Sequence, residues 1–156
     1  MLDRDNNVKL YNFHYGVKTL KNLIPIWESM VSFVPDLIVG IGGGTTSDLV
    51  GLAASSYQRG IPHYIFPTTI LGMIDASLGG KTGIDFGGIK NSIGAIHYPK
   101  LVVNVMEALD TLPKVEFLSG FAEAIKAGVI FNPGFFEALQ FYGKSQNFNW
   151  NNSILI

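Results

Sequence analysis

Apolar residues along this chain follow two patterns, one with the spacing of a helix and one made of short continuous runs. Apolar positions three or four residues apart predict helices over 17–33, 115–131 and 135–142. Pro25 falls inside the first of these stretches. That helix is therefore expected to bend there, or to restart with the proline in its first turn.

Strands are predicted where a short apolar run is bounded by proline or glycine. The run at 36–41 is followed by three glycines, which is typical of a buried parallel strand that leads into a tight loop. Further short strands are expected at 63–66 and 101–105. Between the strands, the sequence predicts a helix of small residues at 45–57 and a short helix at 68–74.

The order of these elements predicts the fold class. Strands and helices alternate early in the chain, and helix follows helix late in it, which indicates an α/β fold. We expect part of a parallel layer (1–112) joined to the start of an α-helical domain (113–156). The apolar last residues carry no helix C-cap signal, so the sequence is expected to be cut from a longer one.

Composition and charge narrow the function classes. Of the 156 residues, 47% are hydrophobic and 15% are charged, which is too apolar for a disordered chain. The formal net charge is −1 without any basic run, which argues against a nucleic-acid partner. No apolar run reaches the roughly 18 residues of a membrane span, the polar start does not resemble a signal peptide, and cysteine is absent. These features predict a cytoplasmic protein, and the scarcity of charge suggests an oligomer.

The glycine-rich stretch 67–91 concentrates the polar chemistry of the chain. Glycine lets the backbone approach a ligand closely, and Lys81 and Lys90 lie among six glycines. This combination suggests a pocket for an anion such as a phosphate or a carboxylate. The alternative is a glycine-rich surface hairpin with two solvated lysines, and the spacing alone leaves both open.

A second glycine cluster joins a predicted strand to a predicted helix. Gly42, Gly43 and Gly44 can cradle a phosphate there, because a helix N-terminus offers free N–H groups and a positive dipole end. A tight structural turn is the alternative, since the G-x-G-x-x-G fingerprint is absent. Asp48 is predicted either to bind a ribose hydroxyl or to complement the dipole. Arg59, after that helix, either faces the C-terminal end of the dipole or binds an anion.

Two further sets of titratable residues lie outside the glycines. Glu123 and Lys126 share a helix face among small and apolar residues, which favours a pocket over a surface ion pair. His14, His63 and His97 show no metal-ligand spacing, and structural roles are expected for them.

The order and spacing of the motifs resemble 3-dehydroquinate synthase and its sugar-phosphate cyclase relatives. The chain carries, in the family's order, GGGTTSD, YQRGI, PTTIL, DASLGGKT, KNSIG, PK, LDTLP and GFAEAIK. The match runs from Gly42 to Lys126. It implies that the parallel layer is part of a Rossmann-like nucleotide-binding domain, followed by the start of the helical metal and substrate domain.

This resemblance implies an enzyme that uses NAD and a divalent metal, zinc or cobalt. It would cyclise 3-deoxy-arabino-heptulosonate 7-phosphate to 3-dehydroquinate with loss of phosphate, in the shikimate pathway. The cofactor would oxidise a ring hydroxyl, which acidifies the neighbouring carbon, and the ketone would later be reduced again. NAD is therefore catalytic and unchanged at the end, and positioning and electrostatics carry most of the work.

The resemblance also assigns roles to individual residues. Those implied to hold NAD are Gly43, Gly44, Asp48, Thr68, Thr69 and Thr111. Those implied to act on the substrate or between substrate and cofactor are Asp75, Lys81, Lys90, Asn91, Lys126 and Arg59, the last from a neighbouring subunit of a homodimer. Glu123 is implied to be a metal ligand, and Gly16 and Lys18 match an upstream cofactor contact only in part.

Three functions follow as hypotheses. The first is a 3-dehydroquinate synthase fragment without full activity by itself, because Glu123 alone cannot make a tight zinc site. The second is a related cyclase acting on sedoheptulose 7-phosphate or glucose 6-phosphate, against which the GGKT and KN segments argue. The third is a non-catalytic nucleotide-binding or dimerisation module.

Overall fold

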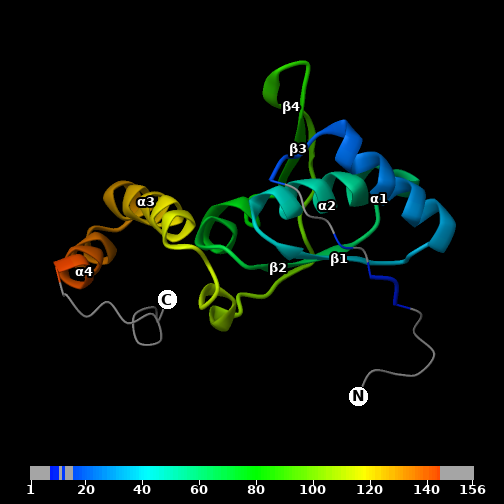
Figure 1. The fold of residues 1–156 in the computed structure, drawn as a ribbon. Helices are drawn as coiled ribbons and strands as arrows, with labels where there is room; N and C mark the ends of the chain where they lie inside the picture. Colours follow the sequence, from blue (N-terminus) through cyan, green and yellow to red (C-terminus); the bar gives the residue numbers. More distant parts are fainter. Residues whose placement is uncertain (1–7, 11, 13–15, 145–156) are drawn as a thin grey trace.

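A computed structural model of the chain describes residues 8–10, 12 and 16–144 (Figure 1). Its elements, in chain order, are α1 (Leu20–Phe33), β1 (Ile38–Gly42), α2 (Gly44–Ser56), the 3₁₀ turn η1 (Tyr57–Arg59), β2 (His63–Pro67), the π-helical turn η2 (Gly72–Ala76), β3 (Lys81–Phe86), β4 (Ile89–Ile96), β5 (Leu101–Val102), the 3₁₀ turn η3 (Met106–Leu109), α3 (Lys114–Phe131) and α4 (Pro133–Lys144).

Strands β1, β2 and β5 form a parallel sheet in the order β1-β2-β5. Both α1 and α2 lie on the same side of this sheet (Figure 1). The parallel strand predicted at 36–41 is confirmed, but its predicted burial is wrong on one face: Val39 is 46% exposed and Ile41 69% exposed. Alternate side chains of a strand point to opposite faces, and the two helices cover only one of them.

The glycine-rich stretch folds into an antiparallel hairpin of β3 and β4, joined by Gly87 and Gly88 at positive φ. The hairpin that the sequence left as one of two alternatives is found, and Lys81 and Lys90 are both exposed on it. The pairing shifts register next to Asp85, as at a β-bulge. The hairpin packs against α2 and extends beyond it (Figure 1).

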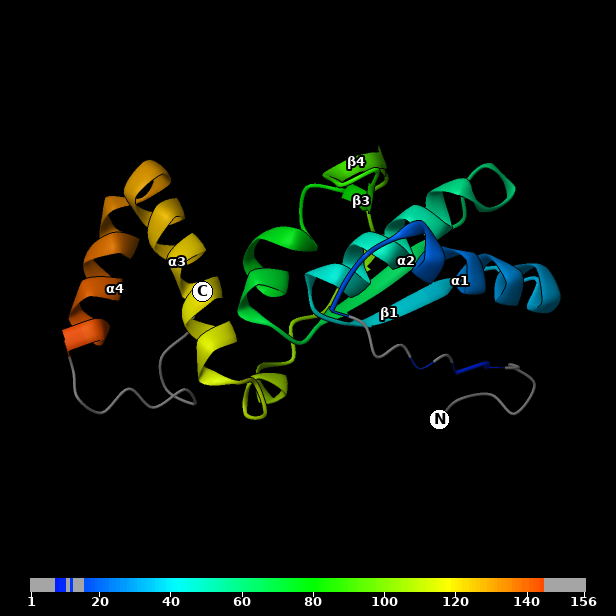
Figure 2. The same cartoon turned by 45° about the horizontal axis from the view of Figure 1, so that its top comes forward.

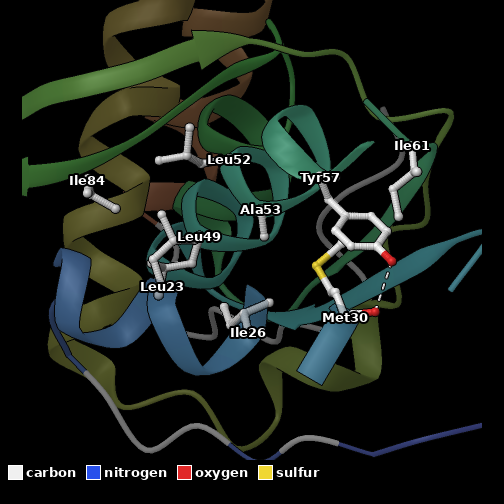
Figure 3. Packing of buried hydrophobic residues seen from close by; sticks show 10 residues of the cluster. Leu23, Ile26, Met30, Leu49, Leu52, Ala53, Tyr57, Ile61 and Ile84 are labelled. Carbon is white, nitrogen blue, oxygen red and sulfur yellow. Dashed lines mark hydrogen bonds between the residues drawn. The ribbon is translucent and has the colours of Figure 1, made fainter. Parts of the chain in front are cut away.

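Helices α1 and α2 and strand β3 enclose the main core. Leu23, Leu49, Ala53 and Ile84 are each at most 3% exposed, and they come from three elements that are distant in the sequence. The Tyr57 hydroxyl closes one end of this core by donating a hydrogen bond to a main-chain carbonyl of α1 (Figure 3).

The last two helices pack on each other and extend away from the sheet, beyond η2 (Figure 2). Gly120 of α3 allows a close approach to η2: a Cβ there would lie 2.7 Å from the Leu71 nitrogen. A second, smaller core lies at this junction and contains Ile70, Met73, Leu109 and Phe117.

Most predicted elements are present with shifted ends. Helix α1 begins at Leu20 and runs continuously through Pro25, so the chain does not restart there. The helix expected at 68–74 begins at residue 70 and becomes a π-helix, and the strand expected at 101–105 spans two residues. The apolar last residues lie outside the described part. Among the described residues, the helices are all too short or too polar to cross a membrane.

Candidate functional site

A cleft of about 1390 Å³ lies where the N-terminal end of α2, the turn η2, the hairpin and the start of α3 meet. Its wall brings together residues that are far apart in the sequence. The residues singled out by the sequence that line it are Gly16, Lys18, Gly43, Gly44, Asp48, Thr69, Asp75, Lys81 and Asn91.

The floor of the cleft is the glycine loop between β1 and α2. A Cβ at Gly43 would lie 3.0 Å from the Thr69 side chain, and one at Gly42 would lie 2.3 Å from Thr46 Oγ1. There is little room for a side chain at either position, so the backbone is open to the cleft. The first N–H groups of α2 have no partner within the helix and face this end of it, so the loop suits an anion such as a dinucleotide phosphate.

One wall of the cleft is held by Lys18, which matched the family's cofactor contact only in part. Lys18 Nζ is ion-paired with Asp48 Oδ2 and donates a hydrogen bond to Asn91 Oδ1. The Asp85 carboxylate accepts from the Asn91 N–H at 2.8 Å, and the Asp85 N–H donates to the Lys18 carbonyl oxygen at 2.7 Å. Lys18 thus connects the chain before α1 to both α2 and the hairpin.

Among the residues that line the cleft, Asp48 has a shifted pKa. Burial raises its pKa above the usual value for an aspartate, while the hydrogen bond and the charge of Lys18 act in the opposite direction. Asp48 lies beyond the first turn of α2, so its partner is Lys18 rather than the helix dipole.

Lys18→Met is expected to raise the pKa of Asp48 further, because it removes the hydrogen bond and the charge that favour the carboxylate. A carboxyl-detected NMR titration measures this shift. Lys21→Met, which changes an exposed lysine of α1, is the control and should leave the Asp48 titration unchanged. An unchanged Asp48 titration in Lys18→Met would contradict the ion pair.

Asp75 and Lys81 both line the cleft and are both exposed. Asp75 belongs to the π-helical turn η2, which widens the helix by one residue at this point. Lys81 is the first residue of β3. An acceptor and a cation therefore face the same volume as the glycine loop, an arrangement that suits a ligand with both a hydroxyl and an anionic group.

Four other residues from the sequence motifs lie outside the cleft wall. Thr68 donates its N–H to the Gly42 carbonyl oxygen at 2.9 Å and so supports the loop from behind. Lys90 and Thr111 are exposed and do not line the cleft, and neither does Arg59, which has a positive φ of 69° after α2.

The pocket predicted around Glu123 and Lys126 is not found in the described structure. The two side chains form an ion pair on α3, 34% and 60% exposed respectively, and neither lines the cleft. The hydrogen bond to Glu123 is the main cause that raises the pKa of Lys126, and the charge of Asp75 contributes in the same direction. Of the small neighbours that suggested burial, Gly128 packs against α4 and Ala124 is buried, whereas Ala122 is exposed.

Comparison with known proteins identifies the family to which the chain belongs. A model of the N-terminal part of 3-dehydroquinate synthases matches residues 14–119, which is more than half of the chain. The chain belongs to the 3-dehydroquinate synthase family.

Known members of this family and its structural neighbours support the same conclusion. A 3-dehydroquinate synthase of Citrifermentans bemidjiense is 45% identical over 128 residues, 80% of this chain and 35% of the relative. The 2-epi-5-epi-valiolone synthase of Streptomyces hygroscopicus subsp. jinggangensis, solved with NAD⁺ and Zn²⁺, superposes with a TM-score of 0.79 at 34% identity, over 85% of this chain and 38% of that one. A 2-deoxy-scyllo-inosose synthase with carbaglucose-6-phosphate, NAD⁺ and Co²⁺ gives 0.69 at 29% identity, over 72% and 32%. The chain spans about a third of the length of the curated relatives it matches.

The metal that the family implies is not matched by the donors of the described residues. Among them, no cluster of three or more His, Cys, Asp or Glu side chains can hold a metal ion. Glu123, the implied ligand, has Lys126 as its neighbour, and a zinc site normally needs three protein ligands. The part of this 3-dehydroquinate synthase family member that the structure describes does not form a zinc site.

Several cleft residues were not identified from the sequence. They are Thr45, Thr46, Ser92, Glu116 and Ser119. Thr45 and Thr46 follow the glycine loop directly, so their place in the first turn of a helix was a usable signal. Glu116 and Ser119 lie three residues apart on α3, and only the fold brings that face to the cleft.

Proposed function

We propose that this chain is the NAD- and phosphate-binding part of a 3-dehydroquinate synthase. The reaction would be the cyclisation of 3-deoxy-arabino-heptulosonate 7-phosphate to 3-dehydroquinate with loss of phosphate. One observation carries the proposal: the glycine loop, Asp75, Lys81 and Asn91 converge on one cleft. The identity of about 45% to 3-dehydroquinate synthases supports this activity over those of the solved cyclases, at 34% and 29%.

NAD would lie across the N-terminal end of α2. When bound, it supplies the hydride acceptor and donor of the reaction. The backbone of Gly43 and Gly44 would hold the pyrophosphate, and Asp48 would accept a hydrogen bond from a ribose hydroxyl. Lys18 would hold the Asp48 carboxylate in place. The roles of Thr68 and Thr111 rest on the family resemblance.

The sugar phosphate would occupy the side of the cleft formed by η2 and the hairpin. Lys81 would bind the phosphate oxygens through charge-assisted hydrogen bonds, and the Asn91 amide would donate a further one. Asp75 would accept a hydrogen bond from the hydroxyl to be oxidised and so orient it. Because these groups mainly orient the ligand, their contribution to the rate would be one of positioning.

The remaining residues of the motifs belong to the proposal through the family. Lys90 would lie between cofactor and substrate, and Lys126 would bind a substrate hydroxyl. Glu123 would contribute one donor to a metal whose other ligands lie outside the described residues. Arg59 would reach the phosphate of a neighbouring subunit in a homodimer, which agrees with its exposed position away from its own cleft.

The domain division and the cellular site complete the proposal. Residues 1–112 would form the NAD-binding part, and 113–156 would begin the helical domain. The lack of a membrane-spanning helix among the described residues is compatible with the cytoplasm, where we expect this biosynthetic reaction. A related cyclase acting on sedoheptulose 7-phosphate or glucose 6-phosphate is the alternative, because both solved cyclases share the fold of this cleft.

Calorimetric titration of the chain with NAD tests the central part of the proposal. Gly44→Val is expected to weaken NAD binding by about tenfold, since its Cβ would lie 3.2 Å from the Ala76 Cβ and the side chain would occupy the phosphate loop. Gly134→Val, in α4 and away from the cleft, is the matched control. Failure of the unmodified chain to bind NAD, or equal binding by Gly44→Val, would count against the proposal.

A further inference from the structure

Behind one wall of the cleft lies a pair of stacked histidines that the proposed function does not use. His63 is the first residue of β2 and is 1% exposed. Its ring stacks on that of His97, which follows β4, with 5.0 Å between ring centroids and an interplanar angle of 17°. The pair therefore joins the end of the hairpin to the parallel sheet.

The hydrogen bonds of the two rings differ. His97 Nε2 lies 2.9 Å from the Ile61 carbonyl oxygen, which can only accept, so this nitrogen carries a hydrogen. His63 Nδ1 is buried and has no hydrogen-bond partner among the described residues. One ring thus anchors the hairpin to the chain before β2, and the other is held by packing alone.

A small cavity of about 10 Å³ adjoins both rings, which is close to the room that one water molecule needs. Its other walls include residues of α2 (Ser47), of η2 and its C-cap (Ala76 and Ser77) and of β3 (Lys81 and Thr82). Lys81, Thr82 and Ala76 also line the large cleft, so the histidine pair lies directly behind that wall.

The charges that face His63 all oppose its protonation. Its titratable neighbours around the cavity are His97 and Lys81, and the described lining contains no carboxylate. Burial, followed by the charge of His97, lowers the pKa of His63 from 6.5 to about 4. An imidazolium at His63 would be a buried cation without a counter-charge.

We propose that His63 and His97 form an acid-sensitive latch that holds the hairpin against the sheet and keeps the Lys81 wall of the cleft in place. With His63 neutral, the two rings stack and the hairpin is docked. Protonation of His63 places a buried cation beside His97 and Lys81, and the hairpin separates from β2. The latch requires no ligand in the cleft.

The sign of the pH dependence follows from linkage. Because the pKa of His63 is lower in the folded chain than in the unfolded one, the unfolded chain takes up the proton first as the pH falls. The stability contributed by neutral His63 is present above pH 6.5 and is lost as the pH falls to about 4. Within this window, each unit by which the pH falls raises the unfolding constant of the chain by up to about tenfold, through the protonation of His63 alone.

Urea unfolding of the full chain between pH 7.5 and 4 measures that loss. His63→Phe keeps a stacked aromatic ring but removes the titrating group. The unfolding constant of this variant should depend less steeply on pH, by up to about tenfold per pH unit, which is the contribution of one proton. His14→Gln removes the third histidine of the chain as the control and should retain the pH dependence of the unmodified protein. Equal pH slopes for His63→Phe and the unmodified chain would overturn the latch.

NMR of the unmodified chain gives a second test, which does not require any variant to fold. We expect the His63 ring resonances to titrate well below pH 6. The Lys100 amide proton, which bonds the His63 carbonyl oxygen, should lose protection from exchange, corrected for the intrinsic rate, over the same pH range, while α1 and α2 keep theirs. An ordinary His63 titration, or protection of the Lys100 amide that persists through it, would refute the proposal.

Discussion

Gly94→Val is expected to separate the strands of the hairpin and to lower the free energy of unfolding by about 3 kcal/mol. Gly94 pairs with Gly83 across the two strands. A Cβ at Gly94 would lie 2.1 Å from the Thr82 carbonyl oxygen and 3.1 Å from the Gly83 Cα. Both are backbone atoms, so no side-chain rotation relieves the overlap, and the strands must move apart.

The consequences reach the core and the cleft together, because β3 serves both. Its residue Ile84 is 1% exposed in the main core, and Lys81 and Thr82 line the cleft. Urea unfolding monitored by circular dichroism measures the loss. Ile93→Val, next to Gly94 but at a partly exposed side chain, is the matched control and should change stability by less than about 1 kcal/mol. Wild-type stability in Gly94→Val would show that the strands are not paired in this register.

The parts of the fold that the sequence predicted are those where a local signal and the tertiary structure agree. The apolar run of β1, the glycines after it and the small residues of α2 each favour the conformation that is found. The hairpin was left open because a glycine interrupts the alternation in each of its strands, and the sequence does not say which residues face each other. The exposed face of β1 depends on what covers the sheet, which a local pattern cannot contain.

The candidate site was predictable where its residues share a motif and unpredictable where folding alone brings them together. Gly43, Asp75 and Lys81 belong to short motifs and line one cleft. Lys18 meets Asp48 and Asn91 across 30 and 73 positions of sequence. No spacing argument spans such distances. Glu123 and Lys126 give the opposite case, since apolar neighbours in the sequence suggested a pocket and the helix exposes the pair.

The proposed binding cleft therefore depends on cations of two kinds. Lys18 is engaged by protein acceptors and holds two walls together. Lys81 faces the open volume, and the structure gives it no ion pair with a described residue. The first cation is suited to positioning and the second to a ligand, so removing Lys81 should affect ligand binding more than folding.

Lys81→Met is expected to weaken binding of 3-deoxy-arabino-heptulosonate 7-phosphate to the NAD-saturated chain by about 30-fold, roughly 2 kcal/mol, because it removes one charge-assisted contact to the phosphate. The variant's affinity should also depend less on ionic strength, since one screened charge is gone. Calorimetric titration at two salt concentrations measures both effects. Lys100→Met, which removes an exposed lysine outside the cleft, is the matched control and should bind as the unmodified chain does. If Lys81→Met and Lys100→Met bind equally well while both retain NAD, the phosphate does not lie against β3. The cleft would then serve the dinucleotide alone.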